Sequence, residues 1–178
     1  MTITITSLAP CDVEALHSLA CDIWRQHYPA IIGTAQTEYM LAQRYARSVV
    51  LGELAEARVW WDVLRERGRM VAFASSFPGE AAREMKLDKL YVRPDRQRRG
   101  YGGTLIAHTC ARAKRLSYER VVLAVNRQNA NAIAAYLKHG FRIREAVVKD
   151  IGCGFVMDDY IMERAVTLSA AAPESARA

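Results

Sequence analysis

A predicted strand, a short basic loop with closely spaced glycines and a predicted helix follow one another between residues 85 and 116, and this junction constrains the fold most. Segment 85–92 (MKLDKLYV) has the apolar pattern of a strand, and Pro94 prevents its continuation. After Gly100-Tyr101-Gly102-Gly103, the segment TLIAHTCARAKRL has helical spacing. The residues expected on the buried side of this helix are Leu105, Ile106, Thr109 and Ala113.

Such a junction is suited to binding an anion. The first turn of a helix carries unpaired amide N–H groups and a partial positive charge, and glycines let a ligand approach the backbone closely. Arg98 and Arg99 add bidentate donors there. Other phosphate motifs are excluded, because G-x-x-x-x-G-K-[ST] is absent and Leu105 stands where G-x-G-x-x-G needs its third glycine. From the residues alone, the alternative is an ordinary strand–helix turn with a solvated basic face.

The rest of the chain predicts an α+β fold around one mixed sheet. Two β-rich runs flank the turn Arg65–Gly68, as in a hairpin, and the apolar run 120–125 is typical of a central strand. In chain order we expect strand 2–6, helices 7–24 and 36–47, strands 58–64, 69–77 and 85–92, helix 104–116, strand 120–125, helix 129–138, and strands 141–148 and 155–164. This order favours a mixed sheet over a doubly wound parallel sheet.

Length and composition predict one domain. The 178 residues suit a single core, so we expect a domain over residues 1–165 and a flexible tail over 166–178, where small residues dominate. The N-terminus has no secretory pattern and no run reaches membrane length, which predicts a cytoplasmic protein without membrane contact. The four cysteines lack metal-ligand spacing, so we expect no metal site and free thiols.

The net charge of +6 is concentrated in one segment. Residues 93–120 hold eight basic and two acidic side chains, so this segment carries the whole surplus, 8 − 2 = +6. Such a segment indicates an anionic partner, which could be nucleic acid, lipid or a phosphorylated small molecule. Because the charge is densest at one helix N-terminus and few aromatics accompany it, a compact phosphate is favoured over nucleic acid. Arg112, Lys114 and Arg115 lie further along the helix and are expected to be solvated.

Gln97-Arg98-Arg99-Gly100-Tyr101-Gly102 resembles the Q/R-x-x-G-x-G/A signature of the GCN5-related N-acetyltransferase (GNAT) superfamily. The similarity extends to the preceding strand, to Asn129, Ala132 and Tyr136, and to Gly140-Phe141. The resemblance implies the GNAT-like acyl-CoA N-acyltransferase fold, in which about four helices flank a mixed sheet with splayed parallel strands, here 85–92 and 120–125. It also implies an enzyme that transfers the acetyl group of acetyl-CoA to a primary amine by direct attack in a ternary complex.

The resemblance also implies where acetyl-CoA binds. Backbone amides of the glycine loop would hold the pyrophosphate, and the backbone near Leu90 and Val92, opened by a β-bulge, would pair with the pantetheine arm and stabilise the oxyanion. Asn129 would contact the cofactor near the exit of the second parallel strand. The expected acetyl-CoA-binding residues are Leu90, Tyr91, Val92, Gln97, Arg98, Arg99, Gly100, Tyr101, Gly102, Gly103, Thr104 and Asn129.

Tyr136 matches the usual general acid of the family. A phenol with a pKa of about 10 stays protonated at neutral pH, so it can donate to the departing thiolate. From the residues alone, the alternative is a tyrosine packed on a helix face. For the base, Asp88 is the carboxylate nearest to the expected reaction centre, and in a regular strand it shares a face with Lys86, Leu90 and Val92. The other candidates for the base are Glu84, His27 and a water relay.

The acceptor site of the family usually forms from the first two helices and the last strands. Here we expect Trp24, Tyr28 and Tyr39 to bind the acceptor, because aromatic rings beside the carboxylates of Asp158 and Asp159 suit an amine cation. Core packing is the alternative for each ring. The acceptor could be a small molecule or a peptide, and family members often form homodimers. The competing hypothesis is a catalytically silent basic binding or regulatory module with the same fold.

Overall fold

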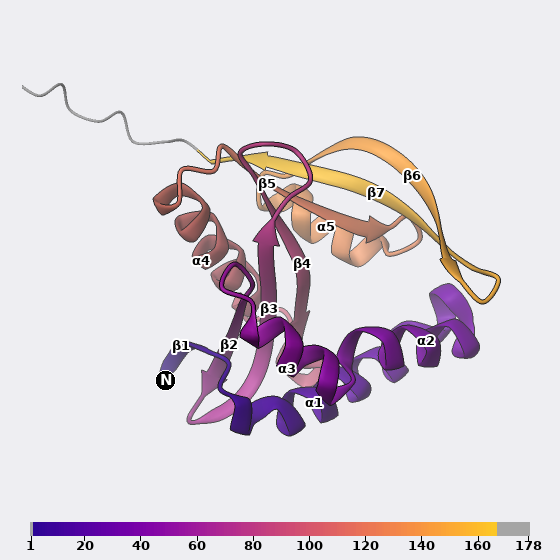
Figure 1. Cartoon of the computed structure of the whole chain (residues 1–178), viewed down its shortest axis with the longest axis horizontal. Helices are drawn as coiled ribbons and strands as arrows, with labels where there is room; N and C mark the ends of the chain where they lie inside the picture. The colour runs from indigo at the N-terminus through magenta and orange to yellow at the C-terminus, as the bar shows by residue number, and fades with distance from the viewer. Residues whose placement is uncertain (1, 167–178) are drawn as a thin grey trace, which may run out of the picture.

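The computed structural model describes residues 2–166, which form a twisted seven-stranded sheet with helices on both faces (Figure 1). In chain order the elements are β1 (Ile3–Ser7), a 3-10 turn (Pro10–Asp12), α1 (Val13–His27), α2 (Pro29–Tyr45), α3 (Arg47–Ala55), β2 (Trp60–Glu66), β3 (Arg69–Pro78), β4 (Glu84–Val92), a 3-10 turn (Pro94–Arg96), α4 (Tyr101–Arg115), β5 (Arg120–Asn126), α5 (Ala130–Lys138), β6 (Arg142–Gly152) and β7 (Phe155–Ala165).

The sheet is mixed, as the element order predicted. Its strands lie in the order β1-β2-β3-β4-β5-β7-β6. The first four form an antiparallel meander, β4 and β5 run parallel, and β7 lies antiparallel between β5 and β6. The expected α+β class is therefore confirmed.

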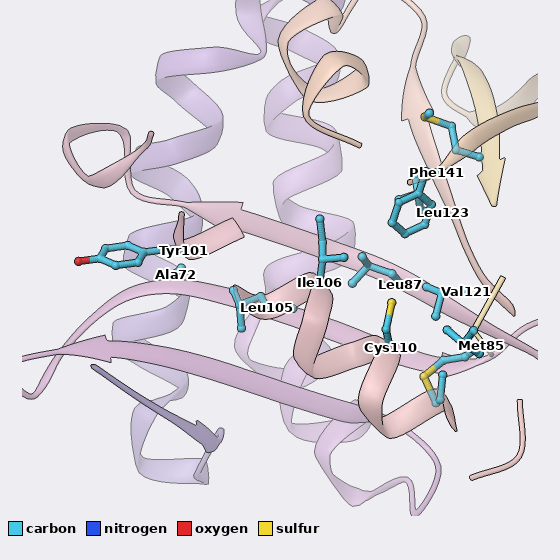
Figure 2. Packing of buried hydrophobic residues seen from close by; sticks show 14 of the residues in the cluster. Ala72, Met85, Leu87, Tyr101, Leu105, Ile106, Cys110, Val121, Leu123 and Phe141 are labelled. Carbon is cyan, nitrogen blue, oxygen red and sulfur yellow. The ribbon is translucent and has the colours of Figure 1, made fainter. Parts of the chain in front are cut away.

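Two apolar clusters cover the two faces of the sheet. On one face α1, α2 and α3 bury Leu16, Trp24 and Tyr45 against Trp61 and Phe73. On the other face α4 packs on the sheet, and α5 lies beside β5 and β7 (Figures 1 and 2). The residues in this second contact include Leu105, Ile106, Cys110, Met85, Leu87, Val121, Leu123 and Phe141. The buried stripe predicted for α4 is confirmed.

The two parallel strands separate soon after they meet. Only Glu84, Met85 and Lys86 of β4 have partners on β5. Beyond that point β4 still pairs with β3 and β5 still pairs with β7, so each strand continues with one free edge toward the other. The expected splayed strands are confirmed. At the closed end, Arg144 of β6 donates to the buried Glu84 at 2.9 Å and thereby ties the last hairpin to β4.

A β-bulge at Asp88 changes which side chains share a face of β4. Asp88 is the extra residue between the β3 pairs formed by Leu87 and Lys89. Leu90 and Val92 therefore pack with the α4 cluster, as Leu87 does. The expected common face of Asp88, Leu90 and Val92 is wrong, because the bulge shifts the alternation by one residue. The bulge also begins two residues before Leu90.

The helical region before β2 is longer than the sequence predicted. The expected second helix corresponds to α2, which starts at Pro29 and kinks at Gly33, where φ is +79°. The prediction found only the part beyond this kink. Helix α3 was missed, because its apolar residues follow Ala46 with no strong capping residue or amphipathic stripe to mark a new helix.

The C-terminal boundary lies slightly later than expected. Val166, which was assigned to the tail, is buried, and its amide donates to the carbonyl of Glu119 at 2.8 Å. Residues 167–178 of the expected tail lie outside the described residues, so the single domain with a flexible tail stays a prediction. Within residues 2–166, no helix is long and apolar enough to cross a membrane.

Candidate active site

The glycine loop presents free backbone amides at the start of α4. Arg98 and Gly100 have φ values of +61° and +86°, and no side chain in the described part of the chain caps the helix. The amide of Thr104 makes the first helical bond, to the carbonyl of Gly100. The amides of Tyr101 to Gly103 precede that bond and lack helical partners, which leaves them for an anion.

A buried carboxylate of β2, Glu66, contacts residues of this loop. Glu66 accepts 2.7 Å and 2.9 Å hydrogen bonds from Tyr101 Oη and Arg96 Nε, and Arg99 Nη1 lies 3.7 Å from it. Arg99 and Arg96 are therefore oriented by Glu66, and they support the loop. Arg98 forms no ion pair within residues 2–166, so it keeps its charge available to a phosphate. Glu66 could not be identified from the sequence as part of the site, because only the fold brings β2 beside the loop.

Helix α5 closes over the same loop. A Cβ at Gly103 would lie 2.4 Å from Cε1 of His139, the residue after α5, so a larger residue here would have to displace the His139 ring. Asn129 is buried and caps α5, with its Oδ1 accepting from the amide of Ala132 at 3.3 Å. This cap leaves the side-chain NH2 of Asn129 for the expected cofactor contact. Gln97 instead donates to the carbonyl of Val92 at 3.3 Å and ties the loop to the end of β4.

The free edge of β4 runs through the centre of the site. Leu90 and Val92 lie on the part of β4 that has no partner on β5, although both are paired with β3 on the other side. Tyr91 points to the opposite face, where its ring lies 5.8 Å from the ring of Trp24. Backbone groups on a free strand edge can pair with an extended ligand as a further strand would.

Three tyrosines approach one another across the gap between β4 and β5. Tyr28 Oη lies 3.2 Å from Tyr91 Oη on the α1 side. Tyr136 of α5 packs with the cluster on the opposite side and is partly buried. Burial and the nearby Tyr28 phenol raise the pKa of Tyr136. Tyr136 therefore stays protonated over the physiological range and remains able to donate a proton.

Asp88 is tied into a cluster of cations. Its Oδ2 accepts from Arg44 Nη2 at 2.6 Å and from Lys89 Nζ at 2.9 Å, and Lys86 Nζ lies 3.8 Å from Oδ1. Burial alone would raise the pKa of Asp88, but the cations Lys89, Arg44 and Lys86 outweigh it and lower the pKa to about 2. A carboxylate with such partners is a weak base. This arrangement argues against the expected base role and gives Asp88 a structural one.

The expected acceptor residues take three different positions. Trp24 is buried in the core and stacks on Tyr28 with ring centroids 4.2 Å apart, which argues against its direct contact with an acceptor. Tyr28 is only partly buried and stands at the gap. Tyr39 donates to the carbonyl of Ile151 at 2.6 Å, and Gln36 donates to the carbonyl of Val156 at 2.6 Å. These bonds fasten α2 to the β6–β7 hairpin, which reaches over to it (Figure 1).

Part of the basic segment is structural. Arg112 was expected to be solvated, but it is buried and donates to Asp62 Oδ1 of β2 at 2.7 Å. The expectation was wrong because the helix turns this side chain toward β2, and Asp62 compensates its burial. Lys114 and Arg115 are exposed, as expected. Much of the positive charge of this segment is therefore neutralised by carboxylates.

Comparisons with known proteins find relatives of this chain. The model of the acetyltransferase (GNAT) family matches residues 14–141. A spermidine N(1)-acetyltransferase of Thermoplasma acidophilum is 26% identical over 164 residues, which cover 89% of this chain and 97% of that protein. An uncharacterized N-acetyltransferase of Mycobacterium tuberculosis is 33% identical over 100 residues, or 56% of this chain and 63% of the relative.

Solved structures share the fold. The PaiA N-acetyltransferase of Thermoplasma acidophilum, in complex with coenzyme A, superimposes with a TM-score of 0.81 at 23% identity, covering 93% of this chain and 99% of that one. The ribosomal-protein-S18-alanine N-acetyltransferase of Escherichia coli gives a TM-score of 0.70 at 22% identity, covering 99% and 100%.

Proposed function

The chain belongs to the acetyltransferase (GNAT) family and is an acetyl-CoA-dependent N-acetyltransferase, and we propose that a primary amine attacks the thioester directly in the gap between β4 and β5. The observation that carries this proposal is the separation of the two strands beyond Lys86, with the free amides of α4 at one end and Tyr136 beside the gap. An alternative without catalysis would not need a protonated phenol there.

The residues divide the binding of acetyl-CoA among three places. The amides of Tyr101 to Gly103, with Arg98 beside them, would bind the pyrophosphate. The free backbone edge at Leu90 and Val92 would pair with the pantetheine arm and place an amide near the carbonyl oxygen. The side-chain NH2 of Asn129 would contact the arm on the β5 side of the gap.

Tyr136 would serve as the general acid. When the amine attacks, the N–C bond forms, the C–S bond breaks and the sulfur leaves as a thiolate. A phenol that burial keeps protonated can donate its proton to that sulfur, and the proton lost by the nitrogen restores the phenol. Tyr28, which lies near both Tyr136 and the acceptor side, would line the path of the amine.

Two acceptor classes are worth testing first. The name of the Thermoplasma relative points to spermidine, and that of the Escherichia coli neighbour to an N-terminal alanine. Release of the CoA thiol should therefore be measured with spermidine and with a peptide that begins with alanine, each at saturating acetyl-CoA. Amine-dependent thiol release by the wild-type chain supports the proposal. Tight acetyl-CoA binding without thiol release to either acceptor would refute it for these two acceptors, and absence of acetyl-CoA binding would refute it altogether.

A further inference from the structure

One buried carboxylate on the acceptor side has no ion-pair or hydrogen-bond partner within residues 2–166. Asp159 of β7 is 8% exposed, and its Oδ1 forms no hydrogen bond within the described residues. The other buried carboxylates of that part of the chain are all ion-paired, and they are Asp62, Glu66, Glu84, Asp88 and Glu163. An unpaired buried carboxylate is costly, so its retention calls for a function.

The position of Asp159 on β7 directs it to the acceptor face. Tyr160 and Met162, which follow Asp159 on β7, pack with the α4 cluster, where Met162 is fully buried. Because successive side chains of a strand point to opposite faces, Asp159 faces the side of α1 and α2. Its partner on β5 is Asn126, the last residue of that strand, so Asp159 lies at the wide end of the gap.

The groups around Asp159 leave it free to accept a proton. Burial first, and then Asp158, raise the pKa of Asp159 to about 6, against the opposing effects of Lys86 on β4 and Arg44 on α2. Both cations are engaged with Asp88 and form no ion pair with Asp159. Asp158 is itself exposed and paired with Arg127 at 3.2 Å.

The remaining neighbours complete this environment. Val147 of β6 is the residue opposite Asp159, and the exposed Lys149 lies two residues further along that strand. Tyr28, between α1 and α2, links Asp159 electrostatically to Tyr136, because Asp159 contributes to raising the pKa of Tyr28 and Tyr28 does the same for Tyr136. The Asp159 carboxylate and the Tyr136 phenol are thus both close enough to Tyr28 to interact with it electrostatically.

We propose that Asp159 binds the ammonium group of the acceptor and takes its proton before attack on the thioester. This inference rests on the proposed function and supplies a base other than Asp88, whose carboxylate is paired with Arg44 and Lys89. The ammonium gives one proton to the Asp159 carboxylate, and the nitrogen lone pair then attacks the carbonyl carbon. The N–C bond forms, the C–S bond breaks, and Tyr136 protonates the sulfur. The second proton lost by nitrogen restores Tyr136, and Asp159 returns its proton to solvent, so one proton is released per turnover.

If Asp159 is the base, kcat/KM for the acceptor should depend on pH in a characteristic way. An ionised Asp159 and a protonated amine coexist from about pH 6 up to the pKa of the amine, which is about 10 for an alkylamine. The kcat/KM for the acceptor should therefore rise through pH 6 and stay level above pH 7, up to about pH 8 for the α-amine of the alanine peptide and up to about pH 9 for spermidine. Without the carboxylate only the free amine reacts, so kcat/KM should increase about tenfold per pH unit up to those same limits.

The test compares Asp159→Asn with Asp158→Asn, using spermidine and the alanine peptide as acceptors at saturating acetyl-CoA. Asp159→Asn should lower kcat/KM at pH 7 about 100-fold with spermidine and about tenfold with the alanine peptide, whose α-amine has a lower pKa. It should replace the level profile by the rising one and leave the Kd for acetyl-CoA unchanged. Asp158→Asn, at the adjacent position, should keep kcat/KM above pH 7 within about threefold and move the rise to a lower pH, because Asp158 contributes to raising the pKa of Asp159. Asp159→Glu should recover part of the rate and the level profile.

The outcomes separate this inference from the proposed function. If the wild-type chain transfers acetyl groups and Asp159→Asn keeps the level profile, the inference fails while the function stands. If the wild-type chain binds no acetyl-CoA, the function itself fails and the inference with it. If it binds acetyl-CoA but acetylates neither acceptor, the NMR titration described next decides the inference. Should Asp159→Asn not fold, an NMR titration of the Asp159 carboxyl in the wild-type chain decides instead. A pKa near 6 supports the inference, and a value below about 4.5 overturns it.

Discussion

Replacing Asp88 with asparagine tests whether this residue stabilises the fold or serves as the base. The carboxylate is 8% exposed and neutralises Lys89, which is itself only 2% exposed. Because the cations lower its pKa from the ordinary 3.8 to about 2, the ionised side chain stabilises the folded state by about 2 kcal/mol at neutral pH. Asp88→Asn should cost about that free energy of unfolding, since Lys89 then keeps only Glu53, at 3.2 Å.

The contribution of Asp88 to stability should depend on pH in a definite direction. A folded-state pKa below the unfolded one gives stability that is present above pH 4 and is lost as the pH falls toward 2. Urea unfolding followed by tryptophan fluorescence should therefore show a difference between wild type and Asp88→Asn that is constant from pH 5 to 7 and shrinks below pH 4. Asp158→Asn, which removes an exposed pair, should change stability by less than about 0.5 kcal/mol. An unchanged stability together with a large loss of turnover would refute this reasoning and restore Asp88 as the base.

Three further substitutions test other parts of the site. Tyr136→Phe should lower kcat about 100-fold while the Kd for acetyl-CoA, measured by calorimetry, stays within about threefold, and full turnover would remove the acid role. Gly103→Ala should destabilise the fold by about 1–3 kcal/mol and weaken acetyl-CoA binding, because the new Cβ would lie 2.4 Å from His139 Cε1. Adding His139→Ala should restore much of both losses in melting and binding assays, and failure to do so would contradict the steric cause. Arg144→Ala leaves the buried Glu84 without its 2.9 Å partner and should cost about 1–3 kcal/mol in urea unfolding, whereas no change would show that this pairing is dispensable.

The sequence predicted those parts of the fold that depend on local pattern. The apolar stripe of α4 follows from helical spacing, and it is present in the structure. Trp60 and Trp61, adjacent in a strand, face opposite sides as alternation requires, with Trp61 buried against α1 to α3. The missed helix α3 has neither a capping residue nor an amphipathic stripe, so only its packing on the sheet marks it.

What the sequence could not predict depends on contacts between distant segments. The bulge at Asp88 is set by the pairing of β4 with β3, and it decides that Leu90 and Val92 face α4. The position of Arg112 on its helix does not by itself show whether the side chain is buried. Its burial depends on the position of β2, which brings Asp62 within hydrogen-bond distance. The isolation of Asp159 is likewise invisible in the sequence, because it results from Arg44 and Lys86 being engaged elsewhere.

A crystal structure of the wild-type chain with coenzyme A bound is the measurement that tests the account most directly. The account predicts the pyrophosphate on the amides of Tyr101 to Gly103, the pantetheine arm along the free edge of β4 at Leu90 and Val92, and the sulfur within hydrogen-bond distance of Tyr136 Oη. Coenzyme A bound outside the gap between β4 and β5, or a sulfur remote from Tyr136 with the pyrophosphate in place, would contradict it.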